Sequence, residues 1–525
     1  MANRIQMAPV LLFLAVVFGT ACVQTRSAEY PAEIEKVLEK ARDNRGELQK
    51  TLTYFQQQGD SMGLASAQYL IGNLEGHRYT VYALYDSSHS EVSLDVLDYP
   101  DYQTLIKALD DIESRRGELD FKKKDSIMDI DVITSQYLIE NITWALKAWH
   151  EKPWSRHLSF NDFCAYVLPY RGSGEPLQSW RQSCWQRYEG LKQQMQDPHD
   201  PVEAAQLINS DIKSWFRFDE RFYCHPTDQG LSEMVTNQMG RCEDMTNLTI
   251  YAMRANGLAV TSDYTPAWAN AGNNHAWNAI LTPDGRAIPF MGAEANPGEY
   301  RLGHRIAKVY RKMFAHQPGN LAFLKNEDED VPPWLGGRSY IDVTADYVDV
   351  SDVTITCDST AAAGRNFAYL AVFNSGEWRA IHWGRINDGQ VTFTDMGTDI
   401  VYLPTIYFDE KLIPLAAPFI LGPDGRITTL PADTLRTATV NLTATDPQSC
   451  AGDSGETAVS HLSVGIEYEL FFFNDGWQSL GTMITGEKPL QWCDVPDGGL
   501  YWLVAKDSRK EERIFTLENG RQKWW

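Results

Sequence analysis

The sequence predicts an α+β protein in which a largely helical N-terminal half leads into a mixed α+β core, followed by two tandem antiparallel β-sandwich domains. Two periodicities support this fold class. From about residue 30 to 220, apolar side chains recur at intervals of three, four and seven, the spacing of amphipathic helices. After residue 340 the period becomes two, which is typical of strands separated by Gly, Asn, Asp and Pro turns. The length of 525 residues suits several domains.

The expected domain boundaries follow breaks in these patterns. Pro, Gly and acidic residues interrupt the apolar stripes and mark the ends of segments. In chain order we expect a signal peptide of the lipoprotein type at 1–22, a helical domain at 28–200, the α+β core at 201–325, a solvated linker at 326–338, and β-sandwich domains at 339–438 and 439–525.

The two C-terminal domains are predicted from a repeat. The sequence FNSGEW at residues 373–378 matches FNDGW at residues 473–477, with one residue deleted. Two copies about 100 residues apart indicate tandem domains, each with its own core. The repeated aromatic side chains could form a glycan- or peptide-binding face, but hairpin turns with packed Trp side chains are the favoured interpretation.

The N-terminus has the pattern of an export signal. Arg4 precedes an apolar run at residues 10–18, which is too short to span a bilayer as a helix but fits a signal peptide. The sequence Gly-Thr-Ala-Cys at residues 19–22 resembles the lipobox of bacterial lipoproteins, although Gly19 replaces the usual branched apolar residue. We therefore expect an exported protein of the periplasm or cell envelope that contacts the membrane only through a lipid anchor at Cys22. The alternative is ordinary cleavage after Ala21.

Charge and cysteine content limit the partners. The net charge is −23, with 47 Lys and Arg against 70 Asp and Glu, and such a surface repels phosphate backbones, so nucleic-acid binding is excluded. None of the 8 cysteines forms a CxxC pair, which gives a structural zinc site no support, and we expect no cofactor. In an oxidising compartment, disulfides such as Cys164–Cys184 or Cys357–Cys450 are possible, but the sequence does not establish the pairing.

The candidate catalytic residues lie within residues 230–300, and the first of them is next to a predicted helix. Gly-Arg-Cys-Glu-Asp at 240–244 precedes an apolar helical run that closes at Gly257, a residue type that commonly terminates helices. The apolar face predicts that this helix packs in the core. Cys242 would lie in or just before its first turn, where the positive helix end and free N–H groups stabilise a thiolate and can bind an oxyanion.

A β-hairpin follows the helix. Residues 274–281 alternate in character, Thr-Pro-Asp-Gly at 282–285 is a strong turn signal, and residues 287–291 form the returning strand. This places His275 on a strand next to the helix. A Cys at a helix start and a His on an adjacent strand are the parts of a thiol–imidazole dyad, in which the imidazole removes the thiol proton and later protonates the leaving group.

The sequence motifs around Cys242 and His275 resemble those of a known family. Gly-x-Cys-x-Asp at 240–244, its helix, and Asn-His-Ala-Trp at 274–277 resemble the transglutaminase-like superfamily, whose papain-like α+β core occurs in transglutaminases, thiol proteases and peptide N-glycanases. The resemblance covers about residues 200–300 and implies that Cys242 is the nucleophile and His275 the base. The arrangement also looks like bacterial secreted multidomain proteins that carry such a core between a helical region and β-sandwiches.

The group that should orient the imidazole departs from the family pattern. Met291 stands where an Asp is expected, and it cannot usefully accept the imidazole N–H. We assign this role to Glu294, the nearest carboxylate. A two-residue hairpin turn would place Glu294 on the face of His275, whereas a three-residue Pro-Asp-Gly loop with a bulge would place Met291 there. Asn296 is another candidate, because an amide oxygen can hold an imidazole.

These residues predict a thiol-dependent peptide or amide hydrolase, or an acyltransferase, that uses a Cys242–His275 dyad on a peptide or protein amide substrate. Hydrolysis is preferred to protein crosslinking, because the chain has no obvious calcium loop and is expected outside the cytoplasm. The alternative is a catalytically weak or inactive scaffold that binds a glycan, a peptide or an envelope partner through its helical and β-sandwich domains.

Overall fold

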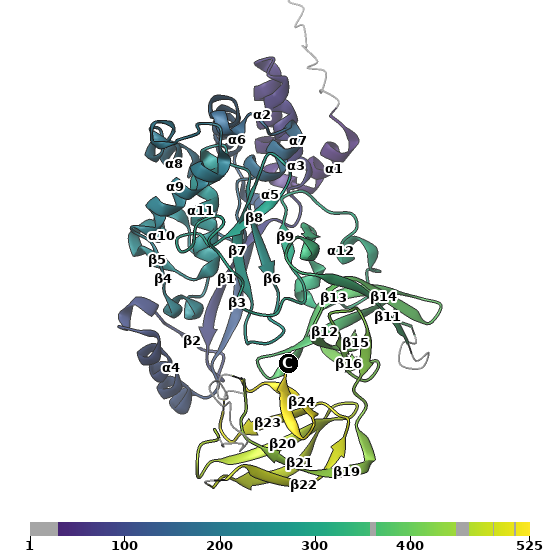
Figure 1. Ribbon diagram of the computed structural model, residues 1–525. Coiled ribbons are helices and arrows are strands. Elements are labelled where there is room, and N and C mark those ends of the chain that lie inside the picture. The colour runs from purple at the N-terminus through teal and green to yellow at the C-terminus, as the bar shows by residue number, and fades with distance from the viewer. Residues whose placement is uncertain (1–29, 358–363, 448–460, 487, 509–510) are drawn as a thin grey trace, which may run out of the picture.

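The computed structural model describes residues 30–357, 364–447, 461–486, 488–508 and 511–525 (Figure 1). The predicted fold class is confirmed, because a helical N-terminal region leads into an α+β core and antiparallel sheets make up the C-terminal half. The expected signal peptide, Cys22 and Cys450 lie outside the described residues. Within these ranges no helix combines the length and apolar character needed to cross a membrane.

The N-terminal helices share one apolar core. This core joins side chains of α1 (Ala32–Lys40), α2 (Arg45–Gln57), α3 (Ser61–Gly72), α5 (Asp129–Val132), α6 (Ser135–Glu151) and the segment after α7 (Phe160–Asp162). Asp60 caps α3 by accepting the Gly63 N–H at 2.8 Å, and Thr134 caps α6 in the same way. The apolar stripe that predicts these helices is therefore their buried face.

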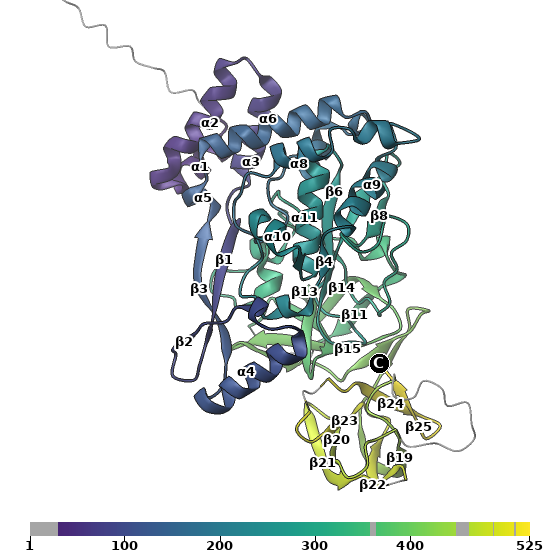
Figure 2. The same ribbon diagram turned by 90° about the vertical axis from the view of Figure 1, so that its left-hand side faces the viewer.

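A three-stranded sheet lies within this region, where the sequence predicts helices. β1 (Arg78–Tyr85) pairs on one side with β2 (Glu91–Val92) and on the other with β3 (Asp120–Met128), and α4 (Tyr102–Arg116) lies between β2 and β3 in the chain (Figure 2). The first six residues of β3 are exposed and include a run of three lysines. An exposed, charged strand has no apolar alternation, so the period of its side chains does not predict it.

The core sheet is antiparallel and has the order β10-β9-β6-β7-β8. Its strands are β6 (Val260–Thr265), β7 (His275–Leu281), β8 (Ala287–Phe290), β9 (Tyr310–Lys312) and β10 (Tyr340–Asp342). β10 follows the expected linker, which contains no strand but is preceded by the short helix α12 (Leu321–Leu324). The core thus takes an edge strand from beyond residue 338, since β10 pairs along its whole length with β9. The Tyr340 ring also packs edge-on against Tyr310, with centroids 5.0 Å apart.

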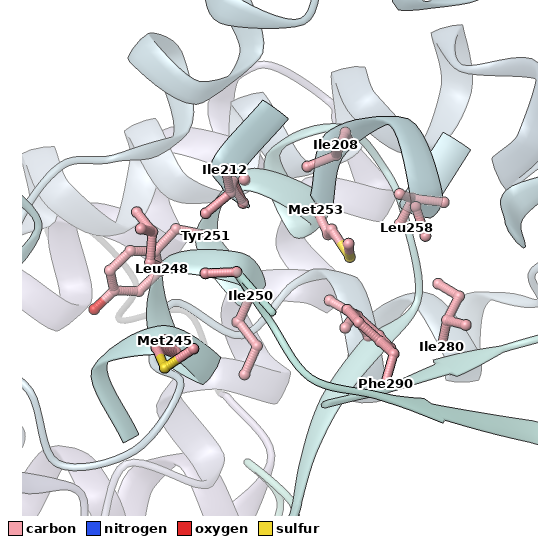
Figure 3. Close-up of a cluster of buried hydrophobic side chains, with 14 of the residues drawn as sticks. Ile208, Ile212, Met245, Leu248, Ile250, Tyr251, Met253, Leu258, Ile280 and Phe290 are labelled. Carbon is pink, nitrogen blue, oxygen red and sulfur yellow. The ribbon is translucent and has the colours of Figure 1, made fainter. Parts of the chain in front are cut away.

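Helix α11 (Cys242–Ala255) lies against β6 and β7, and it is enclosed on its other sides. The surrounding elements are α8 (Arg181–Arg187), α9 (Pro201–Lys213), α10 (Leu231–Asn237) and the parallel pair of β4 (Arg217–Phe218) and β5 (Met239–Gly240). Every residue of α11 from Asp244 to Ala255 is buried. Figure 3 shows the apolar cluster around it, which includes Ile208, Ile212, Ile250, Met253, Ile280 and Phe290. Burying one such side chain contributes roughly 1.5–3 kcal/mol, so packing holds α11 in place.

Two β-domains follow the core. The first β-domain, residues 350–429, is an antiparallel sheet of β11 (Val350–Thr356), β12 (Phe367–Asn374), β13 (Glu377–Asn387), β14 (Gln390–Gly397), β15 (Ile400–Phe408), β16 (Lys411–Pro414), β17 (Phe419–Leu421) and β18 (Ile427–Thr429). The second β-domain, residues 433–525, pairs β19 (Asp433–Leu442) with β22 (Leu490–Asp497) and forms a second sheet from β20 (Glu467–Phe473), β21 (Trp477–Ile484), β23 (Tyr501–Ala505), β24 (Ile514–Glu518) and β25 (Arg521–Trp524).

The repeated aromatic side chains pack between the two β-domains. Phe373 lies edge-on to Trp477 at 5.6 Å, and Phe473 lies edge-on to Trp378 at 5.8 Å, so the two contacts mirror each other. The Trp378 and Trp477 rings are nearly parallel, at 11° and 6.5 Å between centroids. Both copies of the repeat form hairpins, as the favoured interpretation predicts, but their aromatic side chains pack between the two β-domains rather than inside separate cores.

The described cysteines are thiols. Cys164, Cys184, Cys224, Cys242, Cys357 and Cys493 are all free. The suggested Cys164–Cys184 disulfide is wrong, because the two side chains are buried in different apolar clusters, one among the N-terminal helices and one around α11. The suggested Cys357–Cys450 pair includes a residue outside the described ranges.

Gly292 offers a test of the packing between α11 and the sheet. A Cβ at this position would overlap Thr249 Oγ1 and would lie 2.7 Å from the backbone oxygen of Met245. Gly292→Ala should therefore lower the thermal unfolding midpoint of the core, at a cost of about 1–3 kcal/mol for overpacking. Gly303→Ala is the matched control, because a Cβ there meets no atom within 4 Å. Equal midpoints for the two variants would contradict this view of the interface.

Candidate active site

Cys242 is the first residue of α11, as the sequence predicts. The Asp244 carboxylate accepts the backbone N–H of Arg241 at 2.9 Å, which fixes the chain where it enters the helix. The Cys242 thiol is free and 8% exposed. The backbone N–H of Ala276, the residue after His275, lies close enough to the sulfur to favour the thiolate form. The helix start is thus docked directly on the strand that carries the candidate base.

The charge state of the thiol differs from the expected thiolate. Burial, and then the neighbouring Glu243 carboxylate, raise the pKa of Cys242 to about 11, although the Ala276 N–H and Arg241 act in the opposite direction. The donors that a helix end should provide are present, but the loss of solvent around the sulfur outweighs them. At neutral pH the thiol is therefore protonated.

His275 begins β7 and lies in an aromatic setting. Its ring stacks on Trp268 with centroids 5.9 Å apart, and its Nε2 atom is hydrogen-bonded to the Tyr300 hydroxyl at 2.7 Å. Burial, and then the nearby His304, lower the pKa of His275 to about 4. The ring is thus neutral at physiological pH, which is the form that can accept a proton.

Tyr300 is the hydrogen-bond partner of the candidate base. Its pKa is raised mainly by burial and, to a smaller extent, by the charges of Glu294 and Cys242. Although both residues are within the described ranges, no hydrogen bond joins the Cys242 thiol to the His275 ring. Because Tyr300 is hydrogen-bonded to Nε2, a proton accepted by the neutral ring would have to bind at Nδ1.

The β7–β8 hairpin has the three-residue form. Leu281 pairs with Ala287, and the loop places Gly285 at φ 80°, a left-handed conformation that glycine adopts without strain. The paired register ends at Asn278 and Phe290, and the chain then turns, because the N–H groups of Glu294 and Ala295 donate to the Met291 carbonyl. Glu294 therefore lies in a turn and not on a strand beside His275. This arrangement removes the geometric basis for assigning Glu294 to the imidazole.

The expected orienting residues make other contacts. Asn296 accepts a hydrogen bond from the Asn209 amide of α9 at 3.0 Å, and its own amide donates to Ser210. Within the described chain, neither Glu294 nor Asn296 hydrogen-bonds to His275, and Tyr300 takes that place. Tyr300 lies in an irregular segment after the hairpin, where no periodicity or motif identifies it.

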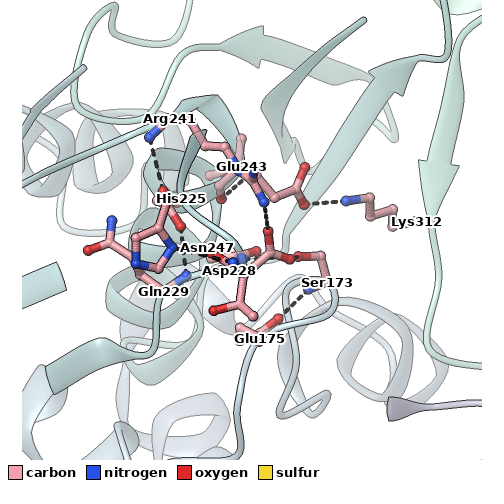
Figure 4. A network of polar contacts seen from close by, with 12 residues as sticks. Ser173, Glu175, His225, Asp228, Gln229, Arg241, Glu243, Asn247 and Lys312 are labelled. Carbon is pink, nitrogen blue, oxygen red and sulfur yellow. Dashed lines mark hydrogen bonds and ion pairs between the residues drawn. The ribbon is translucent and has the colours of Figure 1, made fainter. Parts of the chain in front are cut away.

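A charged network holds the N-terminal end of α11 (Figure 4). Arg241 forms an ion pair with Asp228 at 2.5 Å, and Lys312 of β9 pairs with Glu243. Asp244 accepts the Gln229 N–H at 2.9 Å, and its pKa is raised to about 6 by burial and by Asp228. These contacts give Asp244 a role in fixing the helix start, and none of them directs it toward the Cys242 sulfur.

A groove of about 900 Å³ opens beside the site, between the core and the β-domains. On the core side it is lined by Tyr223, Tyr264, Pro266, Asn273 and Asn274, and on the other side by the β12–β13 hairpin. Asn274, the residue before His275, is the lining residue that connects the groove to the candidate site. No cluster of His, Cys, Asp and Glu suited to a metal ion occurs among the residues that the structure describes.

Comparison with known proteins agrees with this geometry. Residues 189–290 match the family model of the transglutaminase-like superfamily. The matched segment contains Cys242 and His275, whereas Glu294 and Tyr300 lie beyond its end. No curated protein matches the chain.

The titration of His275 provides a test of the neutral site. We expect NMR of the imidazole protons to show a pKa of about 4 for His275, and His304→Gln to raise it, because one positive neighbour is removed. His225 is an internal comparison: burial is the largest single effect and lowers its pKa, but the contacts with Glu233, Thr227 and Asp244 together outweigh burial and raise it. A His275 pKa at the ordinary value of 6.5 would contradict the partly buried, neutral ring.

Proposed function

Because the chain contains a transglutaminase-like domain at residues 189–290, we propose that it is a thiol-dependent acyl-transfer enzyme with Cys242 as nucleophile and His275 as base. The observation that carries this proposal is the docking of the free Cys242 thiol on the backbone N–H that follows His275. A peptide or protein amide is the proposed substrate, and hydrolysis is the preferred outcome.

Because the Cys242 thiol is protonated and the His275 ring is neutral, the thiol proton must move to the ring as the sulfur attacks. The Cys242 sulfur attacks the amide carbonyl while its proton moves to Nδ1 of His275, and N–H groups of the first turn of α11 receive the developing oxyanion. The imidazolium then donates this proton to the departing amine, which leaves a thioester on Cys242. Water, activated by the neutral ring, hydrolyses the thioester, whereas an amine would give transamidation.

Tyr300 is proposed to position His275. A hydroxyl 2.7 Å from Nε2 fixes the ring as a carboxylate would, and it leaves Nδ1 for the thiol. A neutral phenol stabilises the imidazolium less than a carboxylate does, since it carries no opposite charge. We therefore propose a slower enzyme than one with a Cys-His-Asp triad.

A binding scaffold is the second proposed function. Two observations favour it: both Cys242 and His275 are in neutral forms, and a large groove lies next to them. In either case we propose that the protein acts in the periplasm or cell envelope, because residues 1–22 have the pattern of a lipoprotein signal.

Acylation of Cys242 separates the two proposals. With p-nitrophenyl acetate as acyl donor, intact-mass and peptide analysis should show one acetyl group on Cys242 in the wild type and none there in Cys242→Ala. His275→Gln should slow acylation by roughly 10²–10⁴-fold, the usual contribution of a general base. Cys224→Ala is the matched control, because Cys224 and Cys242 are each 8% exposed. An unreactive wild type, or a rate independent of His275, would favour the scaffold.

Tyr300→Phe tests the positioning hydroxyl. Losing the hydrogen bond to Nε2 should lower kcat on the order of 10-fold, equivalent to about 1.4 kcal/mol, and leave KM for the acyl donor unchanged. Tyr223→Phe is the control, because this tyrosine lines the groove without a hydrogen bond to His275. A rise in KM with an unchanged kcat would assign Tyr300 to substrate binding instead.

A further inference from the structure

The loop that leads into His275 is held by a side chain of the first β-domain. Residues 266–274 connect β6 to β7, and three of their carbonyl oxygens converge on the Asn374 amide nitrogen. The distances are 3.0 Å to Trp268, 2.8 Å to Ala271 and 2.9 Å to Asn273. Asn374 is 3% exposed, so water does not compete for these hydrogen bonds. The next residue, Ser375, accepts the Asn273 N–H at 3.2 Å.

A side chain of the second β-domain reaches the same loop. The Arg513 guanidinium donates to the carbonyl of Ala269 at 2.6 Å and to that of Phe373, beside Asn374, at 2.9 Å. Its Nε donates to the Trp525 carbonyl at 3.0 Å. One buried cation therefore connects the loop with both β-domains. The Arg513 side chain donates to backbone oxygens of three separate segments, so the guanidinium ties these segments together.

The loop in turn forms the surroundings of the base. Trp268 stacks on the His275 ring, and Asn273 precedes His275 by two residues. A shift of the loop would move both the wall behind the imidazole and the start of β7. We propose that Asn374 and Arg513 are positioning residues. They act through the loop at 266–274 to hold His275 toward Cys242, and this proposal rests on the proposed acyl-transfer function. The β-domains are then part of the catalytic unit.

The second copy of the repeat shows that the β12–β13 hairpin does not itself require the contacts of Asn374. Asn474 occupies the position of Asn374 in the second copy, but it is exposed, and Asp475 replaces Ser375. The same hairpin thus forms in the second β-domain without an Asn that clamps a loop. The contacts of Asn374 serve the core, and Asn474 provides a matched control within the same chain.

The test compares Asn374→Asp with Asn474→Asp in the full-length protein. The carboxylate has the shape of the amide but cannot donate, and it faces three carbonyl oxygens at position 374. We expect Asn374→Asp to slow acetylation of Cys242 by p-nitrophenyl acetate at least 10-fold, mainly through kcat. Amide hydrogen exchange in residues 266–274 should accelerate by a similar factor, and the NMR titration of His275 should shift. Asn474→Asp should match the wild type in all three measurements.

Milder variants keep the test decisive if Asn374→Asp does not fold. Ser375→Ala removes only the acceptor for the Asn273 N–H, and Arg513→Lys keeps the charge but reaches fewer carbonyls, so both should give smaller changes of the same kind. Wild-type rates and wild-type loop exchange in all these variants would overturn the proposal while leaving the acyl-transfer function intact. If the wild type fails to acetylate, the acyl-transfer function fails, and loop exchange with the His275 titration still decides whether Asn374 positions the base.

Discussion

The arrangement of this protein depends on the burial of α11 from Asp244 to Ala255. A buried helix must take the hydrogen bonds of its polar side chains from its neighbours. Most of these side chains have such partners, whereas Asn247 Oδ1 and Thr249 Oγ1 have none. Arg254, near the end of α11, donates to the backbone carbonyls of Val260 and Arg171, and so joins the helix to β6 and to the loop before α8. Packing along the whole helix thus determines where Cys242, its first residue, meets β7.

Burial also explains the charge state of the site. Removing solvent favours the uncharged form of both groups, so it raises the pKa of Cys242 to about 11 and lowers that of His275 to about 4. The two shifts together favour a neutral pair over a thiolate–imidazolium ion pair. Tyr300 is consistent with such a pair, because a phenol orients a neutral ring without adding charge. A carboxylate at the same place would raise the pKa of His275 and favour the charged form.

The sequence predicts well what depends on local pattern. The start of α11 at Cys242, its end before Gly257 and the hairpin that carries His275 all follow from capping, turn and periodicity signals. The register of the hairpin was open, because Pro-Asp-Gly supports two loop lengths that differ in the parity of the returning strand. Tyr300 could not be identified, since a tertiary contact from an irregular segment has no sequence period. The sheet of β1 and β3 was missed because most of β3 is exposed.

The groove and the loop at 266–274 share a boundary, and this has a consequence for substrate binding. The β12–β13 hairpin lines the groove through residues that include Trp378 and Arg379, while Asn374, at the same end of β12, holds the loop before His275. A ligand in the groove would therefore contact the structure that fixes the base. Binding energy gained along the groove could then be used to hold His275 in its reactive position, which would appear in kcat rather than in KM. The core and the β-domains are not separate units at this boundary, since Asn374 and Arg513 of the β-domains complete the hydrogen bonds of a core loop.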